Sequence, residues 1–78
     1  SGGRDVYIVI DNGATSGIRT TDGTLALDRH KDAAARTLAA LGPGDRAGLI
    51  TLAGPAEAPV APASANIAEV GRLIRELT

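Results

Sequence analysis

An acid and two hydroxyl groups follow the first apolar stretch of the chain. Val6–Ile10 is apolar throughout, and Asp11, Thr15 and Ser16 come after it. In open α/β sheets, ligands bind beyond the carboxyl ends of the strands. Carboxylate and hydroxyl oxygens at such a place are the donors that a hard cation such as Mg²⁺ takes. Asp11, Thr15 and Ser16 are therefore the candidate metal ligands.

The same residues have a simpler interpretation. Mg²⁺ prefers about six oxygen ligands, and the three candidates supply two or three. Asp11 can instead cap the amides of a turn, because Asn12-Gly13 directly after it tolerates positive φ and is typical of turns. A nucleophilic hydroxyl needs a base, and Asp11 is the one candidate base beside Thr15, so catalysis is not expected.

Composition narrows the classes of function. The chain has 78 residues, a net charge of −1 and no cysteine. Interspersed charge gives no reason to expect nucleic acid as a partner, and the lack of cysteine excludes disulfides and thiolate metal sites. His30 has neither a cysteine nor a second histidine to share a metal, so we expect it at the solvated surface. No apolar run approaches the roughly 18 residues of a membrane span.

The periodicities predict an α/β fold of β-α-β-β-α order, a partial Rossmann-like unit with a mainly parallel sheet and one antiparallel edge strand. Prolines confine the third strand to an edge, because each removes a hydrogen-bond donor. The expected elements are a strand over Asp5–Ile10, a helix from about Asp28 to a stop at Gly42, a strand over Ala47–Leu52, an edge strand over Ala58–Ala61, and a helix capped by Ser64 or Asn66. We expect Asp28 to cap the first helix and Gly42 to end it in a left-handed conformation. Asn66 with Glu69 three residues later has the capping-box pattern.

The core is expected between the helices and the sheet. The first strand is apolar on both faces, which is typical of a central strand covered by helices on both sides. Leu38 of the first helix and Ile50 of the second strand are expected to face each other in this core. The apolar helical stripes are Leu27, Ala34, Leu38 and Leu41 with Ala35 alongside, and Ile67, Val70, Ile74 and Leu77 with Leu73 alongside.

The order of elements and the segment LGPGDRAGLITLAG at Leu41–Gly54 resemble the von Willebrand factor A-type (vWA) domain. The likeness is to bacterial, membrane-anchored members of the aerotolerance-regulator sort. It covers residues 5–78 as the amino-terminal part of such a domain, with residues 1–4 as a leader. The resemblance implies a non-enzymatic protein-interaction domain, a soluble segment of a membrane-anchored parent protein.

The vWA family carries a metal-ion-dependent adhesion site (MIDAS) that begins with Asp-x-Ser-x-Ser. Asp11 matches the acid and Thr15 the last hydroxyl, but Gly13 stands where the middle serine belongs. Ser16 is the reserve hydroxyl. The resemblance therefore implies a degenerate site that binds Mg²⁺ weakly or takes no cofactor.

Two other functions remain open. Ile10–Thr15 also resembles the first phosphate loop of actin-like and sugar-kinase ATPases, in which case Ile18–Thr21 and Thr24–Leu27 would form a hairpin. Alternatively, the site has decayed and the fold serves as a structural scaffold.

Assembly is the last expectation. In the resembled fold a later strand pairs with the outer side of the first strand, and that later strand is not in this chain. A free apolar strand edge pairs readily with another chain. We therefore expect a homodimer or larger assembly, joined through Val6–Ile10 or by exchange of helices.

Overall fold

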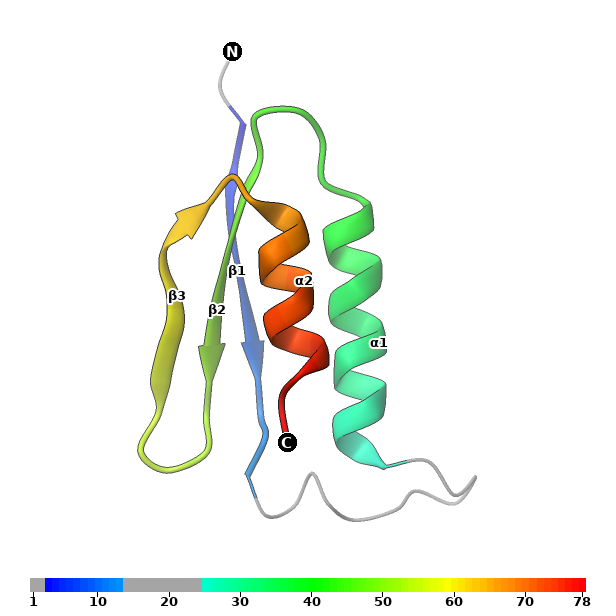
Figure 1. Ribbon diagram of the computed structural model, residues 1–78, viewed down its shortest axis with the longest axis vertical. Helices are drawn as coiled ribbons and strands as arrows, with labels where there is room; N and C mark the ends of the chain where they lie inside the picture. Colours follow the sequence, from blue (N-terminus) through cyan, green and yellow to red (C-terminus); the bar gives the residue numbers. More distant parts are fainter. Residues whose placement is uncertain (1–2, 14–24) are drawn as a thin grey trace.

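The computed structural model describes residues 3–13 and 25–78, which form one three-stranded sheet and two helices (Figure 1). β2 is central: β1 pairs with it in parallel and β3 antiparallel. The α/β class, the order of elements and the antiparallel edge strand are confirmed. The described sheet is mixed, with one parallel and one antiparallel pair, so the prediction of a mainly parallel sheet is wrong for it. The elements are β1 (Asp5–Ile10), α1 (Ala26–Ala39), β2 (Arg46–Thr51), β3 (Glu57–Ser64) and α2 (Ile67–Arg75).

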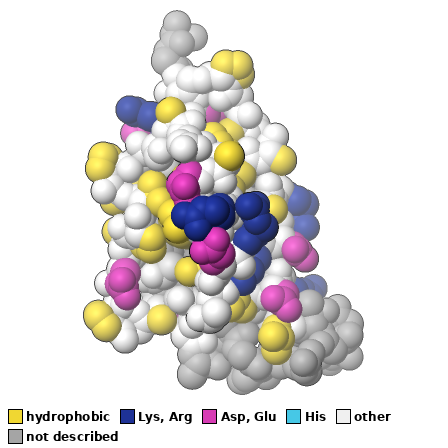
Figure 2. Space-filling model, in the orientation of Figure 1, with side chains coloured by type: hydrophobic (Ala, Val, Ile, Leu, Met, Phe, Trp, Pro, Cys, Tyr) yellow, Lys and Arg dark blue, Asp and Glu magenta, His cyan; other side chains and the backbone are white. Residues whose placement is uncertain are grey.

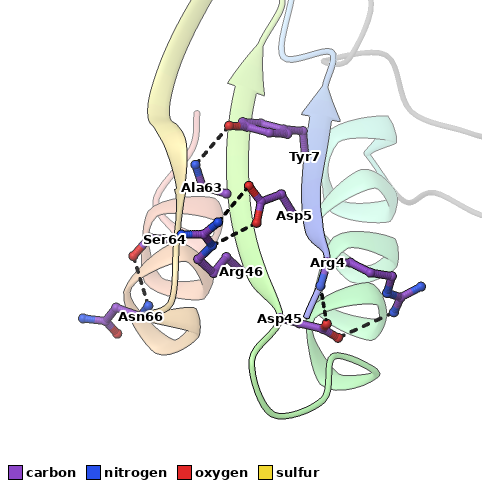
Figure 3. A network of polar contacts seen from close by, with 8 residues as sticks. All are labelled: Arg4, Asp5, Tyr7, Asp45, Arg46, Ala63, Ser64 and Asn66. Carbon is purple, nitrogen blue, oxygen red and sulfur yellow. Dashed lines mark hydrogen bonds and ion pairs between the residues drawn. The ribbon is translucent and has the colours of Figure 1, made fainter. Parts of the chain in front are cut away.

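Both helices cover the same face of the sheet, and they lie together behind the strands in Figure 3. α1 packs against β1, whereas α2 packs against β2 and β3. The expectation of a central first strand covered on both sides is wrong for this structure, because β1 lies at an edge and its burial alternates. Ile8 and Ile10 are buried beneath the helices, while Tyr7 and Val9 face away and are 43% and 56% exposed.

The core lies between the helices and one face of the sheet. Leu49 at the centre of β2 is completely buried, and it meets side chains from both helices. Ile50 points to the opposite face and is only half-buried, so its predicted position in the core is wrong, and Leu49 takes that place beside Leu38. The buried cluster is Ile8, Ile10, Ala34, Leu38, Ala47, Leu49, Val70 and Ile74.

The ends of α1 differ from those predicted. The helix begins at Ala26 after Leu25, whose side chain makes no capping hydrogen bond, so Asp28 lies inside the first turn and is not the cap. The left-handed conformation belongs to Gly44, with φ of 84°, and not to Gly42. Ala35 is exposed, while the rest of the predicted stripe packs in or against the core.

β3 is longer than predicted and irregular. Glu57–Ser64 includes Pro59 and Pro62, which an edge strand tolerates because its outer amides need no partner in the sheet. Its pairing with β2 shifts register on both sides of the Leu49–Val60 pair. These irregularities let the proline-containing strand follow β2 over its full length.

α2 has the predicted cap and the predicted apolar stripe. The Asn66 side chain accepts a hydrogen bond from the Glu69 N–H at 3.1 Å, and Ser64 Oγ accepts one from the Asn66 N–H at 3.0 Å. On the outer face Arg72 bridges Glu69 and Glu76. Figure 2 shows such acidic and basic side chains interspersed over the face that the helices form.

Tyr7 ties the three strands together on the open face of the sheet (Figure 3). It is paired with Gly48 in the register of β1 and β2, and its ring lies so close that a Cβ on Gly48 would come within 2.4 Å of it. Beyond β2, the Tyr7 hydroxyl oxygen accepts a hydrogen bond from the Ala63 N–H of β3 at 3.0 Å.

Asp45 organises the turn between α1 and β2. Its carboxylate accepts hydrogen bonds from the Arg4 N–H and the Gly42 N–H, both at 2.8 Å, and its side chain is only 10% exposed. Arg4 was assigned to the leader from the sequence. Its carbonyl oxygen also accepts a hydrogen bond from the Arg46 N–H at 2.8 Å. These contacts fix the start of β1 against the start of β2.

The pKa of Asp45 is expected to shape the acid stability of the fold. The Arg4 and Gly42 N–H groups hold this pKa below its ordinary value of 3.8. Stability from a lowered carboxyl pKa is present above the unfolded-state pKa and is lost as the pH falls through the folded-state pKa. Asp45→Asn should therefore be less stable than the parent chain near neutral pH, and this difference in stability, the gap, should disappear in acid.

Thermal unfolding followed by circular dichroism from pH 7 down to pH 2 measures this gap. Asp32→Asn, an exposed acid on α1, is the control and should keep a constant difference from the parent. A gap between Asp45→Asn and the parent that stayed constant into strong acid would contradict the role assigned to Asp45.

Candidate functional site

The candidate site lies at the carboxyl end of β1. Asp11 follows the last residue of the strand and is exposed. Its Oδ1 accepts a hydrogen bond from the Gly13 N–H at 2.9 Å. This is the local turn that an Asp two residues before a glycine commonly forms. The arrangement matches the simpler interpretation of Asp11, an acid that caps a turn amide.

Asn12 joins the ends of the two parallel strands. Its side-chain oxygen accepts a hydrogen bond from the Ala53 N–H at 3.0 Å, and the Leu52 N–H donates to the Ile10 carbonyl at 3.0 Å. The end of β1 and the segment after β2 are thus held side by side. Asn12 was interpreted from the sequence only as a turn residue, so this bridging role is new.

His30 attaches α1 to the same corner. Its Nδ1 lies 3.2 Å from the carbonyl oxygen of Asp11, the geometry of a hydrogen bond donated by the Nδ1–H tautomer. The ring remains exposed, as predicted. This contact spans 19 residues, and no local sequence pattern signals it.

Two of the three candidate metal ligands, Thr15 and Ser16, lie outside the described residues, as does Ile18–Thr21 of the ATPase alternative. Over residues 3–13 and 25–78, no group of three or more His, Cys, Asp and Glu side chains could hold a metal. Ala26 and Leu27, the end of the second strand in the ATPase alternative, are helical.

A groove of about 600 Å³ opens beside this corner, between the strand ends and the ends of the helices. Lys31 is one of the lining residues, and its ammonium group donates to the carbonyl oxygens of Arg75 and Leu77 at the end of α2. The lysine therefore neutralises the negative end of the α2 dipole. The other lining residues are Asn12, Gly13, Leu25, Leu27, Asp28, Ala53, Gly54, Leu77 and Thr78.

The comparisons with known proteins found no matching family model, no similar curated protein and no similar solved structure. Among the described residues, no helix has the length and apolar character to span a membrane.

Proposed function

We propose that this chain is a non-enzymatic protein-interaction domain of vWA type, with a degenerate adhesion-site loop at the carboxyl end of β1. The observation that carries this proposal is the position of Asp11. It presents an exposed carboxylate at the corner where two parallel strands end side by side. Asn12 fixes that corner, which makes it a rigid support for a binding loop.

Binding suits this corner better than catalysis. Asp11 uses one carboxylate oxygen to hold the Gly13 amide, so it is not disposed as a free base. The surface of the groove beside it is mainly apolar, although Asp28 also lines it, and its lysine is turned to α2. In the described part of the corner, these groups can make contacts with a partner. As in the resembled family, the domain would belong to a membrane-anchored bacterial protein.

A structural scaffold is the second candidate. The hydrogen bond from Gly13 to Asp11 supports it, because this bond gives Asp11 a role in the turn that needs no ligand. The two candidates differ in what Asp11→Asn does: it weakens partner binding in the first and leaves it unchanged in the second.

The test is a selection of peptides from a displayed random library on the immobilised chain, followed by affinity measurements in millimolar Mg²⁺ and in EDTA. We expect selected peptides to lose about tenfold or more in affinity on Asp11→Asn, because a hydrogen bond to a charged group contributes about 1.5–3 kcal/mol. EDTA should change little, and Mg²⁺ or Mn²⁺ alone should show no saturable binding below millimolar, because the ligand set is short.

Asp32→Asn, on the exposed side of α1, is the matched control. Peptides that bind equally to the Asp11→Asn variant would contradict an adhesion-type corner and favour the scaffold. A micromolar metal affinity that Asp11→Ala abolishes would show that the site is intact and not degenerate. Saturable binding of Mg-ATP at this corner would instead favour the ATPase alternative.

A further inference from the structure

β1 has one side that faces no strand among the described residues. In a parallel pair, alternate residues direct both backbone groups to the same neighbour. The Arg46 N–H donates to Arg4, and the Leu52 N–H to Ile10, so in the register of the two strands the even-numbered residues bond to β2. The N–H and C=O groups of Asp5, Tyr7 and Val9 therefore point outward.

α1 runs along this outward side and forms a slot with the strand. Figure 1 shows α1 as the outermost element on the β1 side. The contact between His30 and the Asp11 carbonyl agrees, since it places the first turns of α1 beside the carboxyl end of β1. The slot has a volume of about 310 Å³, and its lining comes from these two elements: Val6, Tyr7, Ile8, Val9, Ile10, His30, Ala33, Ala34 and Thr37.

The walls of the slot define the chemistry of its occupant. The helix contributes small side chains, Ala33, Ala34 and Thr37, which leave room for side chains of medium size. On the open face, Val9 is an exposed large apolar group beside the same edge, whereas the Tyr7 ring extends away from that edge over β2. Among the described residues of α1 that line the slot, His30 is the one ionisable side chain, and it lies at one end. An uncharged, apolar and extended segment fits these walls.

We propose that the slot between β1 and α1 binds one extended segment of a partner protein, which adds to the sheet as a strand beside β1. The partner's backbone would pair with the outward groups of Tyr7 and Val9, and its alternate side chains would lie under α1. In strand addition the backbone hydrogen bonds provide affinity and the pockets for alternate side chains provide specificity. This surface lies beside the Asp11 corner and shares His30 with it, but its backbone contacts would come from β1 and not from Asp11.

The position of α1 favours a foreign segment over a second copy of this chain. If two β1 strands paired antiparallel in one continuous sheet, the helices of both copies would lie on the same face. Each copy would then bring its own α1 to the space beside β1. An approach closer than about 8 Å between helix axes is sterically unfavourable. The homodimer expected from the sequence is therefore the competing outcome of the test.

The probe is an end-capped peptide with an alternating valine and threonine core and lysines at both ends for solubility. We expect its addition to slow amide exchange at Tyr7 and Val9 at least tenfold, with a much smaller effect at Ile8 and Ile10, which already bond to β2. A peptide of the same sequence with every core amide N-methylated should not bind, because it lacks the donors while keeping the side chains.

Two matched variants on α1 test whether the peptide binds in the slot. Ala33→Gln projects a long neutral side chain into it and should weaken peptide binding at least tenfold. Ala39→Gln should not, since Ala39 lines the different groove between α1 and α2. Both positions are exposed, and glutamine is a good helix former, so both variants should fold.

Three results would overturn the proposal. The first is an equal effect of the two glutamine variants, and the second is binding of the N-methylated peptide. The third is a dimer of the chain alone in sedimentation, with Tyr7 and Val9 already protected from exchange, which would assign this edge to a second copy. None of these results bears on the Asp11 corner.

Discussion

Leu49→Ala should lower the free energy of unfolding by about 2–5 kcal/mol, the cost of a large cavity in a core. Leu49 is completely buried at the centre of β2 and meets the side chains of both helices. Small domains have only about 5–15 kcal/mol of stability, so much of the population should unfold. Urea unfolding followed by circular dichroism measures the change, provided that the slope with denaturant stays constant.

Ile50→Ala is the matched control for Leu49→Ala. It removes a side chain of similar size from the next residue, on the face of the sheet that the helices leave open, where Ile50 is half-buried. We expect a loss of about 1 kcal/mol, which is near the average for point mutations in general. Equal losses from the two variants would show that this open face is covered as well as the other.

Gly48→Ala should destabilise the sheet by about 1–3 kcal/mol or more, because it overpacks a close contact. A Cβ on Gly48 would lie 2.4 Å from two carbon atoms of the Tyr7 ring and 2.8 Å from the carbonyl oxygen of Val60. The ring can move, but the Val60 carbonyl belongs to the backbone of β3. Thermal and urea unfolding of the single variant measure the loss.

A double-mutant cycle identifies the source of this cost. Tyr7→Ala removes the ring, so Gly48→Ala should cost less in that background, and the coupling should exceed 0.5 kcal/mol for residues in contact. Tyr7→Phe keeps the ring and removes only the hydroxyl that Ala63 donates to, so it should leave the cost of Gly48→Ala unchanged. Additive losses in the Tyr7→Ala background would place the strain at Val60 alone.

The elements that could be predicted from sequence are those with local causes. The cap of α2 depends on Asn66 and Glu69, three residues apart, and Asn66 was one of the two caps predicted from the sequence. The start of α1 was misplaced because Leu25 makes no side-chain cap that a sequence pattern would reveal. The left-handed residue was assigned to the first of two nearby glycines, and local pattern does not distinguish Gly42 from Gly44.

Which face of the sheet the helices cover could not be predicted from the sequence, for a different reason. The apolar run of β1 has the pattern of a strand covered on both faces, but a pattern does not show which elements are present to cover it. In this chain both helices take one face, so Tyr7 and Val9 stay exposed. The same ambiguity explains why Ile50 was predicted in the core in place of Leu49, since adjacent residues of a strand point to opposite faces of the sheet.

The candidate site was predictable in position but not in its contacts. Asp11 was placed at a strand end by the apolar run before it, and its turn with Gly13 is local. The bonds from Ala53 to Asn12 and between His30 and Asp11 join residues that are 41 and 19 positions apart. Such contacts follow from the packing of whole elements, so they had no signal in the sequence.

The position of Tyr7 gives this protein an intrinsic optical reporter. Tyr7 is the only aromatic residue in the chain, so all near-ultraviolet absorbance and fluorescence of the side chains come from one phenol group. That phenol lies over β2 and accepts a hydrogen bond from β3. Its emission therefore reports the joining of three strands, and ligand binding at the neighbouring edge can be followed without a label.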